Sequence, residues 1–154
     1  MLSEEEKKEI QEELEMLPYK SAGCIDALKV VQKHRKWISD ESIKDIAEFL
    51  EMSIDEVDGV ATFYNMIYRR PVGQHVVHVC DSVSCWIMGY KDIAAHFSDK
   101  YGIKMGETTK DGKFTLLPVQ CLGTCDRAPA MLIDKKLHRD LTIDKLNEVL
   151  KEYE

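Results

Sequence analysis

The sequence predicts a mixed α and β chain, in which a helical bundle precedes a small α/β layer. In residues 20–68 apolar residues recur at i, i+3, i+4 and i+7, which is the spacing of amphipathic helices. From residue 73 onward, short β-rich runs such as "HVVHV" alternate with helical segments. Two helix breakers, Pro71 and Gly73, stand between the two patterns. We therefore expect a helical region over residues 1–70 and an α/β domain over residues 71–154.

The composition narrows the class of protein. A chain of 154 residues suits one domain, or one domain with a helical extension. The formal net charge of −7 argues against nucleic acid as a partner, because phosphate binding needs a basic face. No apolar run approaches the length of a membrane span, and the first residues lack the apolar region of a signal peptide. We therefore expect a cytoplasmic, reducing compartment, where cysteine pairs are more often metal ligands or redox groups than disulfides.

The first two helices are expected to differ in exposure. Near the N-terminus Ile10 and Leu14 fall at helical spacing among many glutamates, and Pro18 ends the pattern. A solvated, charged helix explains this segment, and a docking arm for a partner is the alternative. Residues 22–34 carry an apolar stripe that includes Cys24. We expect Cys24 to be a small core residue rather than a ligand or a nucleophile.

The next two helices carry clear start signals. Ser39 or Asp40 can cap the first of them, and Ser53 with Glu56 forms a capping box at the start of the second. Three aromatic residues follow in the second helix and beyond it: Phe63, Tyr64 and Tyr68. At helical spacing we expect them to lie in the core and at an interface rather than to form a stacking platform.

The α/β part reads as strand, helix, strand, strand, strand, helix. The first strand leads into Cys80, and Gly102 closes the helix that follows. A second strand ends at Cys121, a hairpin turn falls at Lys135–Lys136, and Thr142 caps the last helix. One parallel crossover followed by a hairpin is the pattern of a thioredoxin-like sheet.

Four cysteines follow the first two strands of this pattern in two unequal pairs. Cys80 and Cys85 have the spacing C-x4-C, and Cys121 and Cys125 have the spacing C-x3-C. Ligands gather at the carboxyl ends of strands in α/β folds, so neighbouring strands would bring all four thiols together. Four sulfurs suit zinc or an iron–sulfur cluster, since thiolates hold both.

The spacing leaves both metals open. Structural zinc favours ligands two to four residues apart, and the wider first pair lies at the edge of that range. A two-iron cluster gives each iron one pair of cysteines, so that wider loops are natural. A disulfide needs an oxidising compartment, and a thioredoxin-type catalyst needs C-x-x-C, which is absent from the chain. A Rieske centre needs two histidine ligands, whereas we expect His75 and His78 to be strand residues.

Two long segments carry a resemblance to a known family. "GVATFYNMIYRRPVGQHVVHVCDSVSCWIMGY" and "TTKDGKFTLLPVQCLGTCDRAPAMLID" resemble the thioredoxin-like [2Fe-2S] ferredoxin family, and within it the E subunits of bacterial respiratory NADH:quinone oxidoreductase. The resemblance extends from about Ala22 to the end of the chain. It implies a cis peptide bond before Pro129 and no ligand role for Cys24. It also implies a single [2Fe-2S] cluster whose ligands are Cys80, Cys85, Cys121 and Cys125.

The resemblance further implies a division of labour within a complex. Members of this family dock on a flavoprotein, the F subunit, which binds NADH and FMN, with the large iron–sulfur G subunit alongside. The cluster lies near the flavin and accepts an electron reversibly. The complex would hold the chain at the inner membrane without inserting it. The chain itself has no G-x-G-x-x-G motif, no P-loop and no evident catalytic residues, so we expect an electron-transfer subunit that docks through its helical region.

Two alternatives to this interpretation remain. Similar small subunits serve NAD(P)-linked hydrogenases and formate dehydrogenases, where the same cluster works in a different complex. The alternative from another functional class is a protein-interaction module whose fold is stabilised by a bound zinc ion. The colour of the purified protein separates the zinc module from every [2Fe-2S] protein, because zinc is colourless.

Overall fold

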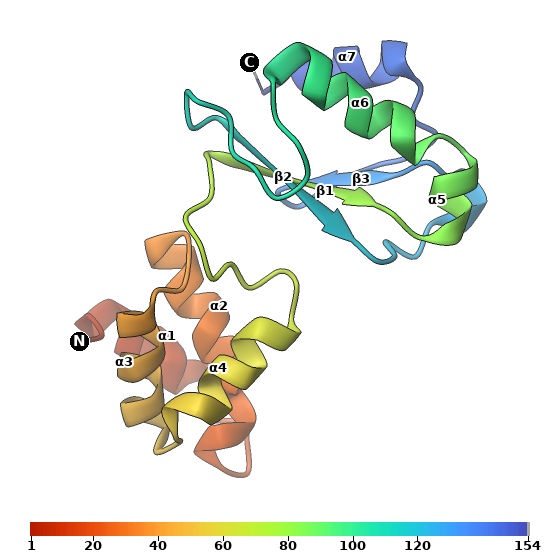
Figure 1. Cartoon of the computed structure of the whole chain (residues 1–154). Coiled ribbons are helices and arrows are strands. Elements are labelled where there is room, and N and C mark those ends of the chain that lie inside the picture. Colours follow the sequence, from red (N-terminus) through yellow and green to blue (C-terminus); the bar gives the residue numbers. More distant parts are fainter. Residues whose placement is uncertain (154) are drawn as a thin grey trace. The chain divides into compact units, whose positions relative to one another are not determined.

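The computed structural model describes residues 1–153 and divides the chain into two compact units, Met1–Pro71 and the residues from Val72 onward (Figure 1). The helical unit contains α1 (Glu4–Leu14), the 3-10 turn η1 (Lys20–Gly23), α2 (Cys24–Arg35), α3 (Asp40–Leu50) and α4 (Ile54–Phe63). The sheet unit contains β1 (His75–Cys80), α5 (Val83–Ile87), α6 (Tyr90–Tyr101), β2 (Phe114–Val119), the 3-10 turn η2 (Cys125–Arg127), β3 (Met131–Ile133), β4 (Lys136–His138) and α7 (Ile143–Lys151). Throughout residues 1–153, every helix is too short or too polar to cross a bilayer.

Helix α1 packs into the helical unit, so the prediction of a solvated helix is wrong. Its apolar residues Ile10 and Leu14 are buried in the same core as α2. Glu6 is buried as well, and the Arg35 guanidinium donates to its two carboxylate oxygens at 2.7 and 2.8 Å. The helix also ends at Leu14 rather than at Pro18. A buried carboxylate is tolerated here because a charged partner and hydrogen bonds satisfy it.

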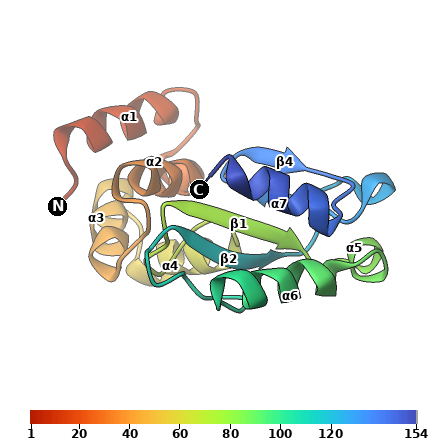
Figure 2. The ribbon, with the colours of Figure 1, turned by 90° about the horizontal axis from the view of Figure 1, so that it is seen from above.

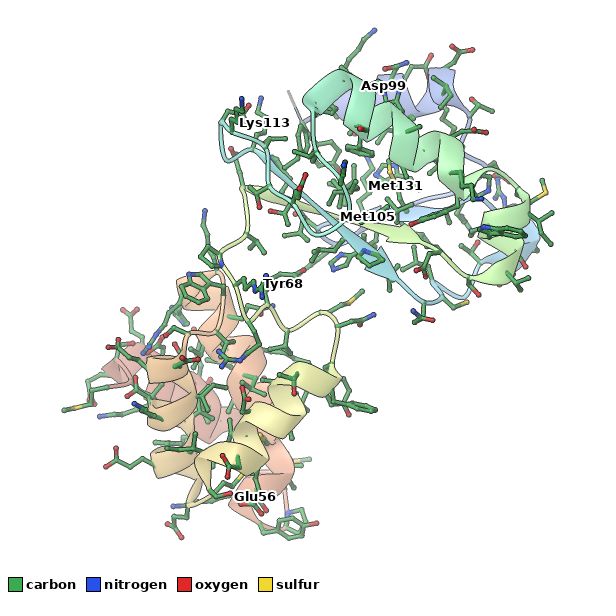
Figure 3. The ribbon with its side chains drawn as sticks, viewed as in Figure 1. Glu56, Tyr68, Asp99, Met105, Lys113 and Met131 are labelled. Carbon is green, nitrogen blue, oxygen red and sulfur yellow. The ribbon has the colours of Figure 1, made fainter. Side chains whose placement is uncertain are left out.

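The predicted caps of the helical unit are confirmed. The Ser39 hydroxyl accepts from the backbone N–H of Ser42, so that Ser39, rather than Asp40, caps α3. Ser53 and Glu56 form the capping box of α4, and Glu56 is labelled in Figure 3. Cys24 is buried in the apolar core, as its place on the helical stripe predicts.

The aromatic residues at the end of α4 and after it contradict the prediction of a core position, whereas their place at an interface stays a prediction. Phe63 is 80% exposed and Tyr64 is 46% exposed, so neither belongs to the core of this chain. The helix ends at Phe63, and the backbone of Tyr64 is extended. The helical spacing therefore stops before these side chains can join the buried face. Tyr68 is partly buried, and its backbone N–H donates to the side-chain oxygen of Gln32 at 2.6 Å.

The sheet has the strand order β2-β1-β3-β4, with β1 and β2 parallel and the other two pairs antiparallel. Helices α6 and α7 lie on one face of the sheet, and Figure 2 shows β1 and β2 side by side. Met131 is fully buried in the core that the strands and these helices share (Figure 3). The predicted order of strands and helices is confirmed except for the additional helix α5, and the closing Gly102 and the Thr142 cap are confirmed.

Three local predictions in the sheet unit need correction. The strand β2 ends at Val119, two residues before Cys121. The tight turn of the hairpin falls one residue earlier than expected, because Asp134 takes the left-handed conformation (φ 53°) and β4 already begins at Lys136. The segment after Cys80, which the sequence predicts as a loop, contains the short helix α5. Five residues are too few for apolar periodicity to reveal a helix.

Candidate metal centre

The parallel pairing of β1 and β2 brings both cysteine pairs to one edge of the sheet. Cys80 is the last residue of β1 and lies opposite Val119, the last residue of β2. The backbone N–H of Asp81 donates to the carbonyl of Val119 at 3.0 Å, which continues the pairing beyond the strands. On the other side of β1, the N–H of Cys80 donates to the carbonyl of Ala130 at 3.1 Å. The segment that contains Cys121 therefore starts beside Cys80.

The first pair of thiols is buried. Cys80 and Cys85 are each 2% exposed, and their side chains are hydrogen-bonded to each other. The Cys85 thiol lies on α5, so this ligand candidate stands on a helix and not in a loop as expected. Burial raises the pKa of Cys85 to about 11, and the hydrogen bond with Cys80 contributes to the rise. Without a cation this thiol stays protonated, and a bound metal ion would displace its proton.

The second pair of thiols is exposed. The Sγ atoms of Cys121 and Cys125 lie 3.7 Å apart, far longer than the roughly 2.05 Å of a disulfide, so the pair is a dithiol. The hydrogen bond with Cys121 raises the pKa of Cys125, whereas a hydrogen bond with Ser84 lowers it. The backbone N–H of Gly123 donates to the Cys121 sulfur at 3.3 Å. Gly123 has φ 71°, a conformation that glycine adopts without strain.

The two pairs of thiols are close enough to influence each other electrostatically. A charge on Cys125 contributes to the raised pKa of Cys85, and a charge on Cys80 contributes to the raised pKa of Cys125. The side chain of Ser84, on α5, hydrogen-bonds with Cys125. Within residues 1–153, no three His, Cys, Asp or Glu side chains are arranged to bind a single metal ion. Two dithiols are the ligand set that a [2Fe-2S] cluster uses, with one pair of sulfurs for each iron.

The chain beyond η2 packs against the buried pair of thiols. The peptide bond between Ala128 and Pro129 is cis, as the resemblance implies. Arg127 forms an ion pair with Asp140, and the backbone N–H of Leu141 donates to the carbonyl of Pro129 at 3.1 Å. Apolar side chains surround the buried thiols: Tyr90, Val119, Leu122, Ala128 and Ala130. This packing restricts water at the inner pair.

The two histidines of β1 lie on the strand, as expected. The Nδ1 atom of His75 lies 2.7 Å from one carboxylate oxygen of Asp134, and the other oxygen accepts from the backbone N–H of Val76. His78 is 1% exposed, and burial lowers its pKa, which favours the neutral ring.

Sequence reasoning missed several features beside the thiols. Ser84 and Thr124 are visible in the sequence as small polar residues between the cysteines, but the sequence does not show that the Ser84 hydroxyl reaches Cys125 or that the Thr124 hydroxyl is buried. Four large apolar side chains of α5 and its C-cap are exposed: Val83, Trp86, Ile87 and Met88. Their run around Cys85 is visible in the sequence, but burial is the usual state of such residues.

Comparisons with known proteins agree on one family. A family model described as "Thioredoxin-like [2Fe-2S] ferredoxin" matches residues 10–154. A protein from Pseudomonas aeruginosa, named as the E subunit of NADH-quinone oxidoreductase, is 45% identical over 153 residues, covering 99% of this chain and 92% of that protein. A protein of the same name from Escherichia coli K12 is 47% identical over 152 residues, again covering 99% and 92%.

Solved structures match the fold at lower identity. The crystal structure of an NAD+-reducing [NiFe]-hydrogenase in the air-oxidized state contains a chain that superposes with a TM-score of 0.72 at 21% identity. The match covers 85% of this chain and only 22% of the longer hydrogenase chain. The same enzyme in the H2-reduced state gives the same values. These matches support the thioredoxin-like fold.

Proposed function

Because the chain belongs to the thioredoxin-like [2Fe-2S] ferredoxin family, we propose that it carries one [2Fe-2S] cluster and transfers electrons as the E subunit of an NADH-quinone oxidoreductase. The observation that carries this proposal is the meeting of two dithiols at the carboxyl ends of two parallel strands. The relatives with this name match nearly the whole chain, and their name describes an oxidoreductase that uses NADH and a quinone.

Cys80 and Cys85 would hold one iron, and Cys121 and Cys125 would hold the other. When bound, such a cluster accepts and releases single electrons. The residues of this chain then bind the irons, restrict water at the inner pair and donate hydrogen bonds to sulfur. The Gly123 N–H already points at the Cys121 sulfur. Donors of this kind raise the reduction potential, because they stabilise the more negative reduced state.

The hydride chemistry belongs to a partner in this proposal. The sequence lacks a dinucleotide-binding motif, so NADH and FMN would bind to a flavoprotein, the F subunit, with the large iron–sulfur G subunit alongside. Exposed apolar residues of the helical unit offer a surface for docking: Tyr19, Phe63, Tyr64 and Met66. Through these partners the chain would lie on the cytoplasmic side of the inner membrane. We therefore propose that residues 1–70 dock the partner and that residues 71–154 hold the cluster.

A second candidate is the equivalent small subunit of an NAD+-linked hydrogenase or formate dehydrogenase. The structural match to an NAD+-reducing hydrogenase favours it, but the identity of 21% supports only the fold. Relatives at 45% and 47% identity favour the quinone-reducing complex. Purification of the chain with its native partners distinguishes the two, because only one complex reduces quinone with NADH.

The test of the cluster itself is chemical and spectroscopic. Protein purified without oxygen should be reddish-brown and contain about two irons and two acid-labile sulfides per chain. After reduction it should give the EPR signal of a single unpaired electron. Colourless protein that holds zinc and no sulfide would overturn the proposal in favour of the zinc module.

A further inference from the structure

Thr124 stands between the two cysteines of the exposed pair, and its hydroxyl is buried without a partner. The residue is 7% exposed, and its Oγ1 atom has neither solvent contact nor a hydrogen bond. The backbone carbonyl of Thr124 is occupied, since it accepts from the N–H of Arg127 at 3.0 Å. A buried hydroxyl without a hydrogen bond loses its water and gains nothing in return. Such a group indicates an acceptor that binds later.

The other buried threonines of residues 1–153 show that this state is unusual in the molecule. The Thr115 hydroxyl accepts from the backbone N–H of Gly73 at 2.7 Å. The Thr109 hydroxyl hydrogen-bonds with Asp111 and accepts from the backbone of Phe114. These residues are as buried as Thr124, at 3% and 7% exposure, and both are satisfied. The fold therefore provides hydrogen-bond partners for the other two buried threonine hydroxyls, and Thr124 is the exception among the three.

Thr124 lies within the segment that joins the two exposed thiols, Cys121 and Cys125. Cys125 follows it directly, and Gly123 before it already donates its N–H to the Cys121 sulfur. The hydrophobic cluster around the buried thiols includes Val119, Leu122 and Ala130. A [2Fe-2S] cluster would bring two sulfides to this site and would be held by the four cysteines as thiolates, and these sulfurs accept hydrogen bonds. Because Thr124 stands between two of these cysteines, a sulfur of such a cluster is the acceptor that its position in the chain offers.

We propose that the Thr124 hydroxyl donates a hydrogen bond to a sulfur of the bound cluster and thereby raises its reduction potential. This inference rests on the proposed function, because it needs the cluster to be present. Reduction adds one electron, which makes the cluster sulfurs better acceptors. The hydrogen bond is therefore stronger in the reduced state and favours reduction. Thr124 is a donor in this role and not a metal ligand.

The experiment compares the midpoint potential of the full chain with that of three variants, by redox titration followed by EPR. Thr124→Val removes the hydroxyl and keeps the size of the side chain, whereas Thr124→Ser keeps the hydroxyl. Thr108→Val is the matched control. The Thr108 hydroxyl hydrogen-bonds with the Thr115 hydroxyl near the start of β2, and the thiols lie at the other end of that strand. We expect Thr124→Val to disfavour reduction about tenfold, which for a one-electron couple is a shift of about −59 mV. Thr124→Ser and Thr108→Val should stay close to the wild type.

Each result decides the proposal. A cluster in Thr124→Val with the wild-type potential overturns it, and so does an equal shift in Thr124→Ser, since the methyl group would then be responsible. If Thr124→Val assembles no cluster, assembly in Thr124→Ser supports the hydroxyl as a donor, and its failure there overturns the proposal. If the wild-type chain holds no iron and sulfide, the proposed function fails first, which is a separate outcome.

Discussion

The substitution Glu6→Gln tests whether a buried ion pair fastens α1 to the helical unit. The carboxylate of Glu6 accepts from Arg35 at 2.7 and 2.8 Å, and it also accepts from the backbone N–H of Ser3 at 2.8 Å. The glutamine has nearly the same shape but no charge. It leaves the Arg35 guanidinium with only the carboxylate of Asp45, at 3.3 Å, as an ionic partner.

The pKa of Glu6 sets the magnitude. Hydrogen bonding to Arg35 lowers this pKa from 4.5 to about 2. A shift of this size corresponds to about 3 kcal/mol of stability at neutral pH. Arg35 is 29% exposed, so solvent screening reduces the contribution, and we expect Glu6→Gln to cost roughly 2 kcal/mol. Because the folded-state pKa is depressed, the contribution is complete above the unfolded pKa of 4.5 and is lost as the pH falls through about 2.

The assay is urea denaturation of the full chain, followed by the NMR amide signals of α2 at several pH values. The difference between wild type and Glu6→Gln should be largest near neutral pH and should shrink between about pH 4.5 and pH 2. Glu12→Gln is the control, because Glu12 lies 3.9 Å from Lys8 and both are exposed; we expect a change within about 0.5 kcal/mol. A neutral-pH difference for Glu6→Gln no larger than this control would refute the reasoning.

Three further predictions concern the cysteines and one close backbone approach. Cys121→Ala should lose the iron and sulfide that Cys24→Ser retains, as measured by metal and sulfide analysis; loss of both in Cys24→Ser would contradict the ligand assignment. In metal-free protein iodoacetamide should modify the exposed Cys121 near pH 8, whereas Cys24, whose pKa burial raises to about 11, should react only after unfolding. Mass spectrometry of the peptides checks this, and equal rates would count against the buried position. Gly73→Ala should destabilise the sheet unit by about 1–3 kcal/mol in urea denaturation, because the added Cβ would lie 2.7 Å from the carbonyl oxygen of Gly112; an unchanged midpoint would show that the two backbones can separate.

The sequence predicted those features that depend on local spacing. The buried stripe of α2 with Cys24, the capping box at Ser53 and the closing Gly102 follow from residues close together in the chain. The meeting of the cysteine pairs needed one further assumption, that the first two strands are neighbours, and the parallel pairing of β1 and β2 confirms it.

The features that the sequence did not reveal depend on distant contacts or on short elements. Glu6 looked like one of many exposed glutamates, because its partner Arg35 lies 29 residues away in the chain. In the sequence, Phe63 and Tyr64 continue the helical spacing of the preceding residues, but the helix ends between them. Thr124 stands inside the C-x3-C spacing, but only the packed structure shows that its hydroxyl is enclosed.

The ladder between β1 and β2 has a consequence for how the length of such chains can vary. Six successive residue pairs, from His75 opposite Phe114 to Cys80 opposite Val119, determine how far each strand runs before its cysteines begin. An insertion at the turn around Asp111–Gly112 falls outside the ladder and leaves this alignment unchanged. One extra residue within β2 would turn its buried side chains outward and shift Cys121 along the edge by the length of a residue. Length changes should therefore be found in the turn and not in the strand.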